Sequence, residues 1–322
     1  MHAAVLSAFG ETPRYAEFPD PVAREGESLL EVRAASLNRV DRARASGGHY
    51  TSGAEGDLPI VCGLDGVGIS MSGARVYFGL PRAPYGSMAE RTVVPDWMLA
   101  PIPSGLSDAE AAALINPGMA AYLPLAWRGR LAAGETVLVL GATGVTGRLA
   151  VQMARLLGAG RVVAAGRDPK ALESLTGLGA DALISLDRPE DELAAAFSAE
   201  AGDEGFHVVV DYLWGPPMNA LLAALTRNEF KAAEHETRIV QVGDMAGPAV
   251  ELPAEVLRSA PVTLTGSGGF APPEVRMEAF GKLCEFAGSG ALKVAVEEVP
   301  LAEVEEAWRR GDRDGRRQVL VP

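Results

Sequence analysis

The sequence predicts an α/β fold in which a doubly wound parallel sheet is joined to an irregular, β-rich domain. Three observations support this prediction. Short apolar runs alternate with helical segments through the middle of the chain, which is typical of parallel βαβ units. A glycine-rich turn follows the first of these runs. Before about residue 118, by contrast, glycine and proline are frequent and helical periodicity is weak.

Length and composition agree with this fold class. The chain has 322 residues, enough for about two domains of roughly 100–200 residues each. Hydrophobic residues make up 48% of the chain and charged residues 22%, which argues against disorder. The two cysteines, Cys62 and Cys284, cannot form a disulfide framework. We therefore expect a compact protein of a reducing, cytoplasmic compartment.

The charge balance narrows the possible partners. Lys and Arg number 29 and Asp and Glu 42, which gives a net charge of −13. Such a surface repels phosphate backbones and acidic membranes, so we expect no nucleic-acid partner. The first ten residues do not resemble a signal peptide. The longest uncharged run, Ala111 to Trp127, is slightly short for a bilayer span and contains Asn116 and two prolines, so no membrane-spanning helix is predicted.

The individual elements follow in chain order. The β-rich region contains short strands such as Ser28–Ala34 and Arg91–Val94. The strands predicted for the parallel sheet are Thr136–Gly141, Arg161–Gly166, Ala182–Leu186, His207–Tyr212, Arg238–Gly243 and Val262–Gly266. The helices predicted among them are Val145–Leu157, Pro169–Leu178, Pro189–Ala201 and Pro217–Arg227. The tail contains a helix at Pro273–Phe286, a strand at Val294–Val299, a helix at Ala302–Arg310 and a strand at Gln318–Val321. Periodicity alone does not assign this tail to either domain.

The glycine-rich turn is the most informative stretch. Between residues 136 and 158 an apolar strand leads through a tight turn into a helix, whose first N–H groups can bind a pyrophosphate. Gly144 would let the backbone approach the phosphates, and Gly147 would let helix and strand pack closely. The place of the glycines between a clear strand and a clear helix predicts a dinucleotide site. The predicted contacts are Gly141, Ala142, Thr143, Gly144, Val145, Thr146 and Gly147.

The end of the second strand indicates which dinucleotide is preferred. An acidic residue about 20 residues after the turn would bind a ribose 2′-hydroxyl. Here the strand ends in Gly166 and Arg167, which leave room for a 2′-phosphate and offer it a guanidinium group. We therefore predict NADPH rather than NADH, with Lys170 as a second, weaker phosphate ligand. Alternatively, Arg167 is a solvated surface charge. Asp168 and Pro169 fit an N-cap followed by the first helical position.

Further cofactor contacts are expected where other strands of the sheet end, because ligands of open α/β sheets collect at that edge. Gly243 and the loop of residues 266–270 follow two such strand ends, and residues 212–215 follow a third. Trp214 in the last of these segments could instead serve packing alone. The predicted contacts are Leu213, Gly243, Gly266, Ser267 and Gly268.

Motifs along the whole chain resemble one known family, the zinc-independent medium-chain dehydrogenases/reductases of the quinone oxidoreductase (zeta-crystallin-like) type. Apart from the glycine turn, they lie at residues 1–5, 9–10, 34–41, 48–50, 58–59, 63–68, 85–90, 116–122, 208–211, 243, 300–307 and 318–322. The resemblance implies a GroES-like catalytic domain formed by residues 1–117 and 261–322. It implies a Rossmann NADP-binding domain formed by residues 118–260.

The resemblance also bears on metal binding. Zinc-dependent members of the wider superfamily have a cysteine where Asn38 stands and a histidine where Leu64 stands. Neither ligand is present here, and no cysteine-rich structural zinc lobe occurs. We therefore expect no metal, and we expect Cys62 to be a small buried hydrophobic residue. His207 and His235 are likewise expected to be structural or solvated.

By the same resemblance, Asn38, Asp41 and Tyr50 lie near the nicotinamide ring. Asn38 is expected to donate a hydrogen bond to the carboxamide or to the substrate oxygen. Asp41 is expected to fix neighbouring backbone rather than to act as a base. Tyr50 is expected either to donate a proton to the substrate or to form only an aromatic wall. Arg317 is a candidate cofactor contact or, alternatively, a surface charge.

These expectations converge on an NADPH-dependent, zinc-free oxidoreductase that transfers hydride to a quinone or a related conjugated carbonyl. One alternative is an enoyl or 2-alkenal reductase on the same scaffold, which saturates a carbon–carbon double bond. An alternative of another class is a non-catalytic NADPH-binding sensor or structural protein. The resemblance further implies a homodimer that joins edge strands near Val262–Gly266, since an exposed apolar edge tends to be covered.

Overall fold

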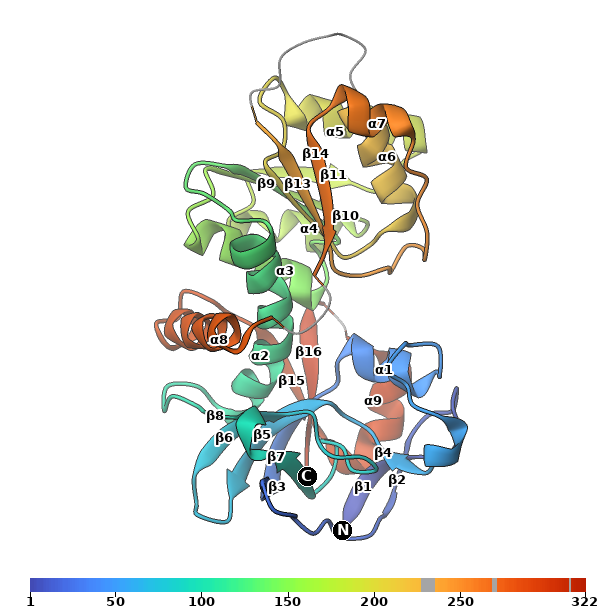
Figure 1. Ribbon diagram of the computed structural model, residues 1–322, viewed down its shortest axis with the longest axis vertical. Helices are drawn as coiled ribbons and strands as arrows, with labels where there is room; N and C mark the ends of the chain where they lie inside the picture. Colours follow the sequence, from blue (N-terminus) through green and yellow to red (C-terminus); the bar gives the residue numbers. More distant parts are fainter. Residues whose placement is uncertain (227–234, 268–270, 313) are drawn as a thin grey trace. The chain divides into compact units, whose positions relative to one another are not determined.

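The fold is described from a computed structural model of the chain (Figure 1). The structure describes residues 1–226, 235–267, 271–312 and 314–322. These residues divide into two compact units. Unit 1 comprises Met1–Asn116 and Cys284–Pro322, and unit 2 comprises Pro117–Leu283.

Unit 2 is built on a parallel sheet with the strand order β11-β10-β9-β12-β13-β14. All of the pairings in this sheet are parallel. The order is that of a dinucleotide-binding fold, in which the chain reverses direction across the sheet between the first and fourth strands. The strands are β9 (Thr136–Leu140), β10 (Arg161–Gly166), β11 (Ala182–Ser185), β12 (Val208–Asp211), β13 (Thr237–Gln241) and β14 (Val262–Gly266).

The apolar character of the central strands explains why they form the middle of this sheet. Every residue of β9 and β12 is buried, as expected for strands covered on both faces. The flanking helices are α3 (Val145–Leu156), α4 (Pro169–Glu173), α5 (Glu190–Ala201), α6 (Gly215–Leu225) and α7 (Ala254–Ser259). Side chains from strands and helices, among them Leu138, Phe197 and Leu221, form one buried core.

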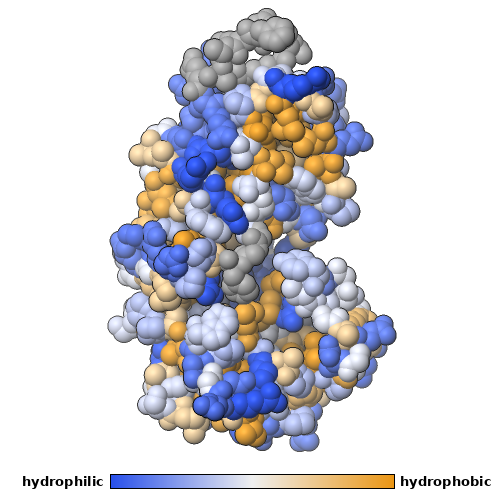
Figure 2. All heavy atoms as spheres, viewed as in Figure 1, coloured by the Kyte–Doolittle hydropathy of each residue, from blue (hydrophilic) through white to orange (hydrophobic). Residues whose placement is uncertain are grey.

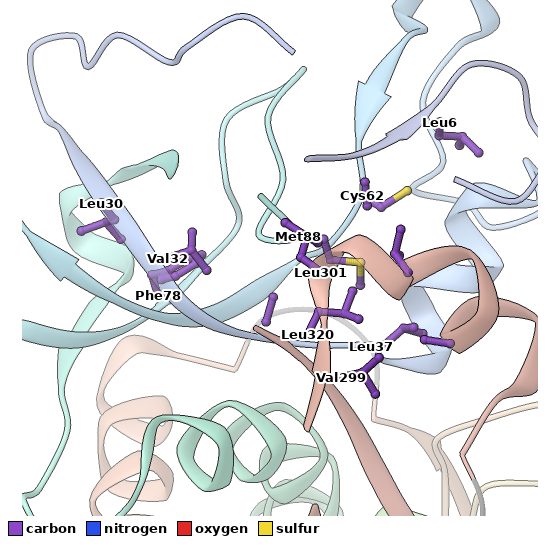
Figure 3. Close-up of a cluster of buried hydrophobic side chains, with 14 of the residues drawn as sticks. Leu6, Leu30, Val32, Leu37, Cys62, Phe78, Met88, Val299, Leu301 and Leu320 are labelled. Atoms are coloured by element: carbon purple, nitrogen blue, oxygen red, sulfur yellow. The ribbon is translucent and has the colours of Figure 1, made fainter. Parts of the chain in front are cut away.

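Unit 1 contains two sheets. The smaller has the order β2-β1-β4, and the larger has the order β15-β16-β3-β5-β6-β8, with β7 paired to β3. The strands of the first sheet are β1 (His2–Leu6), β2 (Arg14–Glu17) and β4 (Ile60–Val61). The strands of the second are β3 (Glu27–Ser36), β5 (Asp65–Ser70), β6 (Arg75–Gly79), β7 (Arg91–Pro95), β8 (Leu99–Pro101), β15 (Ala295–Pro300) and β16 (Arg316–Val321). Figure 3 shows the core of this unit, to which Leu30, Phe78 and Leu320 contribute from different strands.

Unit 1 contains α1 (Arg39–Ala45) and α9 (Val304–Arg310), whereas α2 (Asp108–Tyr122) and α8 (Pro273–Gly288) each cross the boundary between the units along the chain. A π-helical turn at Leu123–Arg128 follows α2, and short 3₁₀ turns lie at Glu55–Asp57, Asp96–Met98, Thr176–Leu178 and Leu301–Glu303. Among the described residues, no helix is both long enough and apolar enough to cross a bilayer.

The predicted strands of the parallel sheet all occur, with ends that shift by at most a few residues. Two differences concern the rest of the chain. Strand β14 pairs with β13 in the parallel sheet, and unit 2 extends to Leu283, beyond the domain boundary expected at residue 260. The tail after it belongs to unit 1, where β16 pairs with β3. Helices α1, α2 and α7 were not predicted; for α1 and α2 the reason is the weak helical periodicity before residue 118.

Candidate functional site

The glycine turn between β9 and α3 has the geometry of a phosphate-binding loop. Gly141 adopts a φ of +84°, which favours glycine. A Cβ atom on Gly147 would lie 2.3 Å from the carbonyl oxygen of Gly141, so only glycine fits at this contact between helix and turn. At both positions glycine is required by the protein's own backbone, at Gly141 by its conformation and at Gly147 by a close contact.

Gly144 differs from these two glycines. A Cβ atom there would meet no atom closer than the carbonyl oxygen of Gly141, at 3.7 Å. Gly144 is also the N-cap of α3, where no side chain caps the helix and no acidic residue lies in the first turn. The first N–H groups of a helix lack partners within the helix and carry partial positive charge. The turn therefore fits the pyrophosphate of a dinucleotide, with space left at Gly144 for it.

The end of β10 lies against this turn. A Cβ atom on Gly166 would lie 2.5 Å from the Cγ2 atom of Thr143, which brings two of the predicted cofactor contacts together. Arg167 and Lys170 follow on the surface, and both are exposed. Asp168 caps α4, with its Oδ1 accepting a hydrogen bond of 2.8 Å from the backbone N–H of Ala171. The predicted N-cap is thus confirmed, and this carboxylate is already engaged.

The turn between β12 and α6 forms the other side of this edge of unit 2. A Cβ atom on Gly141 would lie 3.1 Å from the Leu213 side chain, and one on Gly243 would lie 2.8 Å from the carbonyl oxygen of Tyr212. Leu213 and Gly243 therefore belong to the same strand-end cluster as the glycine turn. At the end of β14, Ser267 donates its backbone N–H to the carbonyl oxygen of Gln241 at 2.8 Å. Gly268 lies outside the described residues.

Asp211 shapes this turn and was not identified from the sequence. Its buried carboxylate accepts hydrogen bonds from the backbone N–H groups of Leu213 and Trp214, at 2.8 and 3.0 Å. Burial raises the pKa of Asp211 to about 6, against the effect of these hydrogen bonds. Trp214 has a φ of 56°, which is rare for a residue with a side chain. Its side chain packs against the core of unit 2, as the packing alternative stated.

In unit 1, Asn38 and Asp41 lie together at the start of α1. Asn38 is the buried N-cap residue, and its backbone N–H donates to Oδ2 of Asp41 at 2.8 Å. This contact gives Asp41 the backbone-fixing position expected of it. The side-chain amide of Asn38 accepts from Ser36 Oγ at 3.2 Å and donates to Asp65 Oδ1 at 2.8 Å. One hydrogen of its Nδ2 atom therefore serves the protein interior.

Asp65 is the centre of a buried polar cluster that sequence reasoning missed. Besides Asn38, it accepts hydrogen bonds from Tyr77 Oη at 2.9 Å and from Asn116 Nδ2 at 3.4 Å. Burial, together with the negative charge of Asp41, raises the pKa of Asp65 to about 8. At neutral pH this shift favours the protonated form of Asp65. It lies in the family-like segment at residues 63–68, but nothing in that pattern identifies its partners.

The remaining predicted residues have different surroundings. Tyr50 is 89% exposed and stacks on His49, with ring centroids 4.2 Å apart. Arg317 is buried, donates to the carbonyl oxygen of Leu37 at 2.8 Å and lies 3.3 Å from Asp312. The alternative that Arg317 is a surface charge is therefore wrong. Cys62 is a free, buried residue of the unit 1 core, as predicted, and burial raises the pKa of its thiol.

Within the described ranges, no three His, Cys, Asp or Glu side chains are grouped so that they could hold a metal ion. Asn38 directs an amide N–H, which is a donor and not a metal ligand, at Asp65.

Comparison with known proteins agrees with this architecture. The family model described as zinc-binding dehydrogenase matches residues 145–281, which lie within unit 2. A probable NADPH-dependent quinone reductase (tdiC) of Emericella nidulans is 31% identical over 364 aligned residues that cover all of both chains. A 2-methylene-furan-3-one reductase of Solanum lycopersicum is 34% identical over 53% of this chain and 48% of its own.

Solved structures show the same relationship over the whole chain. The quinone oxidoreductase of Thermus thermophilus, determined alone and in complex with NADPH, superposes with a TM-score of 0.80 at 30% identity and full coverage of both chains. The full-length similarity in sequence and in structure covers both units. The chain therefore belongs to the quinone oxidoreductase family of the medium-chain dehydrogenases/reductases.

Proposed function

We propose that the protein is an NADPH-dependent reductase that transfers hydride to a quinone or a related conjugated carbonyl. The observation that carries this proposal is the strand-end cluster of unit 2. In this cluster the uncapped N-terminus of α3 lies beside Gly166, and the exposed Arg167 follows Gly166 in the chain. The names of the full-length relatives support it, since both are quinone reductases and both names or titles mention NADPH.

Each part of this cluster has a chemical role in the proposal. The N–H groups of residues 144–147 bind the pyrophosphate, and Arg167 with Lys170 binds the 2′-phosphate. Leu213, Gly243, Gly266 and Ser267 contact the nicotinamide half. When bound, NADPH supplies a hydride, which suits an electron-poor acceptor. Asp211 positions the backbone of the turn that carries Leu213.

Unit 1 contributes the polar groups. Asn38 retains a second amide hydrogen for the oxygen that gains charge during reduction, and Asp65 holds the amide in place. Asp41 fixes the backbone at Asn38. For Tyr50 we propose the aromatic wall rather than the proton donor, because its ring is exposed and stacks on His49. For Arg317 we propose a structural role through Leu37 and Asp312.

The residues at the two expected zinc-ligand positions support a zinc-independent reaction. The position expected to carry a cysteine ligand holds Asn38, and the position expected to carry a histidine holds Leu64. One hydrogen of the Asn38 amide is donated to Asp65. Metal analysis of the purified protein tests this, and stoichiometric zinc at full activity would contradict it.

A second candidate activity is reduction of the carbon–carbon double bond of an enone or enal. The observation that favours it is the similarity to the tomato 2-methylene-furan-3-one reductase. The two candidates form different products from one type of acceptor: a quinol in the first case and a saturated carbonyl in the second.

Consumption of NADPH, followed by its absorbance with a simple quinone and a simple enal in parallel, distinguishes these activities. NADH serves as the cofactor control, and product analysis identifies the reduced bond. We expect rapid oxidation of NADPH with the quinone. Preference for the enal would favour the second candidate, and tight NADPH binding without oxidation by any acceptor would contradict both.

We also propose a cytoplasmic homodimer that pairs through β14. This strand ends the sheet of unit 2 and has one unpaired edge within the described chain. Figure 2 shows hydrophobic residues gathered over β14 and α7, and Leu257 of α7 is 50% exposed. An apolar sheet edge of this kind tends to be covered. Light scattering at micromolar concentration should give the mass of a dimer, and a monomer would contradict the proposal.

A further inference from the structure

The turn between β12 and α6, residues 212–215, has an unfavourable backbone conformation. Trp214 adopts a φ of 56°, in a region that residues with a side chain rarely occupy. Gly215 follows with a φ of 59°, and a Cβ atom there would lie 2.8 Å from the carbonyl oxygen of Ala246. The surrounding structure must therefore hold this turn in its shape.

Asp211 restrains the turn through its carboxylate. The side chain is fully buried, and its Oδ1 accepts hydrogen bonds from the backbone N–H groups of Leu213 and Trp214 at 2.8 and 3.0 Å. Its Oδ2 lies 3.2 Å from the backbone nitrogen of Trp214. Hydrogen bonds to an ionised acceptor are about twice as strong as those to a neutral one. The charge of Asp211 therefore favours the strained turn, and loss of that charge weakens the restraint.

The turn in turn supports the two neighbouring segments of the strand-end cluster. The Cδ2 atom of Leu213 lies close enough to Gly141 that a Cβ atom on this glycine would be 3.1 Å away. The carbonyl oxygen of Leu213 accepts the backbone N–H of Ala246 at 2.7 Å, in the segment that follows Gly243. A shift of Leu213 would therefore change the surroundings of both the pyrophosphate and the nicotinamide half.

No cation compensates the charge of Asp211 within the described part of the chain. Burial raises the pKa of Asp211 to about 6, and only the backbone hydrogen bonds oppose this effect. Its partners in β9 and β13 are uncharged, and neither residues 141–147 nor α6 contain a titratable side chain. The neighbouring phenol of Tyr212 stays neutral, because burial raises its pKa. Asp244, which follows β13, is exposed, so solvent screens its charge.

We propose that Asp211 makes dinucleotide binding depend on pH: its ionised carboxylate holds residues 212–215 in the binding shape, and protonation releases them. Asp211 is thus a positioning residue, which acts on the dinucleotide only through the turn. The inference rests on the proposed function, because it takes the strand ends of unit 2 as the dinucleotide site. Linkage is reciprocal, so a bound dinucleotide also expels the proton from Asp211.

The dissociation constant of NADH, measured by fluorescence titration of the full-length protein between about pH 5.5 and about pH 8, tests the proposal. NADH is the probe because the 2′-phosphate of NADPH itself titrates near pH 6. At about pH 5.5 only about a quarter of Asp211 is ionised, so NADH should bind about fourfold more weakly than at about pH 8. An affinity that does not fall as the pH falls would overturn the proposal.

A matched pair of variants assigns the pH dependence. Asp211→Asn keeps the shape of the side chain without its charge, so NADH should bind weakly and with the same affinity at every pH in this range. Asp203→Asn makes the same change at an exposed residue before β12 and should keep the fourfold dependence. A pH dependence that survives Asp211→Asn, or that disappears in Asp203→Asn, would overturn the proposal.

Proton release gives a second readout that needs no variant. Calorimetric titration of the unmodified protein with NADH, in buffers of different ionisation enthalpy, should show release of about half a proton at about pH 6 and almost none at about pH 8. Absence of this release at about pH 6 would overturn the proposal even if Asp211→Asn does not fold. Failure of the proposed function is distinguishable, because neither NADH nor NADPH would then bind at any pH, which would overturn both.

Discussion

The strand-end cluster of unit 2 and the polar cluster of unit 1 depend on different parts of the chain. In unit 2 the contacts are made by backbone atoms and glycines of one short segment, residues 141–147, against neighbouring strand ends. In unit 1 the contacts are made by side chains, and Asp65 meets Asn38, Tyr77 and Asn116 from separate elements. A binding loop can thus be specified locally, whereas a buried polar cluster requires the tertiary fold.

The largest effect is expected for a substitution at Gly147, because the close contact of this residue with the backbone of the turn leaves no space for a side chain. Gly147→Ala would place a Cβ atom 2.3 Å from the Gly141 carbonyl oxygen. We expect a loss of about 3 kcal/mol in the free energy of unfolding, together with loss of NADPH binding. Denaturant unfolding and fluorescence titration measure the two effects.

Gly144→Ala is the matched control within the same turn. Its Cβ atom would have space, so stability should fall by about 1 kcal/mol or less. Binding of NADPH should nevertheless weaken, because the added atom occupies the place proposed for the pyrophosphate. Equal losses of stability in the two variants would contradict the distinction between packing and binding glycines.

In unit 1 the corresponding test is Asp65→Asn. Burial raises the pKa of Asp65 in the unmodified protein from 3.8 to about 8. The stabilisation from protonated Asp65 is therefore complete below pH about 4 and is lost as the pH rises to about 8. Across that pH range the free energy of unfolding should fall by about 1.4 kcal/mol per pH unit because of Asp65. The asparagine variant resembles the protonated form and should show a shallower decline.

Unfolding of both proteins across this pH range provides the measurement. Asp41 remains in the variant, and since burial also raises its pKa to about 6, a smaller dependence on pH should persist. Glu305→Gln on the partly exposed helix α9 is the control and should leave the profile unchanged. Superimposable profiles for Asp65→Asn and the unmodified protein would show that Asp65 is ionised in the folded state.

A smaller effect is expected for Arg167→Glu, which tests the charged residue directly after β10, next to the Asp168 that caps α4. The ratio of kcat/KM for NADPH to kcat/KM for NADH should fall by at least about tenfold, because a charged hydrogen bond to the 2′-phosphate is lost. Arg258→Glu makes the same change at an exposed residue of α7 that precedes β14, at the opposite end of the strands, and serves as the control. A ratio unaffected by Arg167→Glu would identify Arg167 as a solvated charge.

The smallest effect is expected for Tyr50→Phe. If Tyr50 forms only an aromatic wall, turnover should stay within about twofold of the unmodified protein in steady-state assays. A positioned proton donor contributes on the order of a hundredfold or more. A decrease of that size would restore Tyr50 as the proton donor.

The same contrast explains how far the sequence predicted the molecule. The strands of the parallel sheet, the glycine turn and the Asp168 cap all leave local signals, and the structure contains each of them. Helix α2 left none, since residues 111–115 are buried on every side and Pro117 interrupts the pattern. Asp65 and Asp211 were missed because their burial and partners arise only when distant segments pack together.

The central claim is that the strand ends of unit 2 bind NADPH through its 2′-phosphate. The most direct test is the pair of dissociation constants for NADPH and NADH, measured by fluorescence titration of the unmodified protein without an acceptor. We predict that NADPH binds at least about tenfold more tightly. Equal affinities, or tighter binding of NADH, would contradict the account.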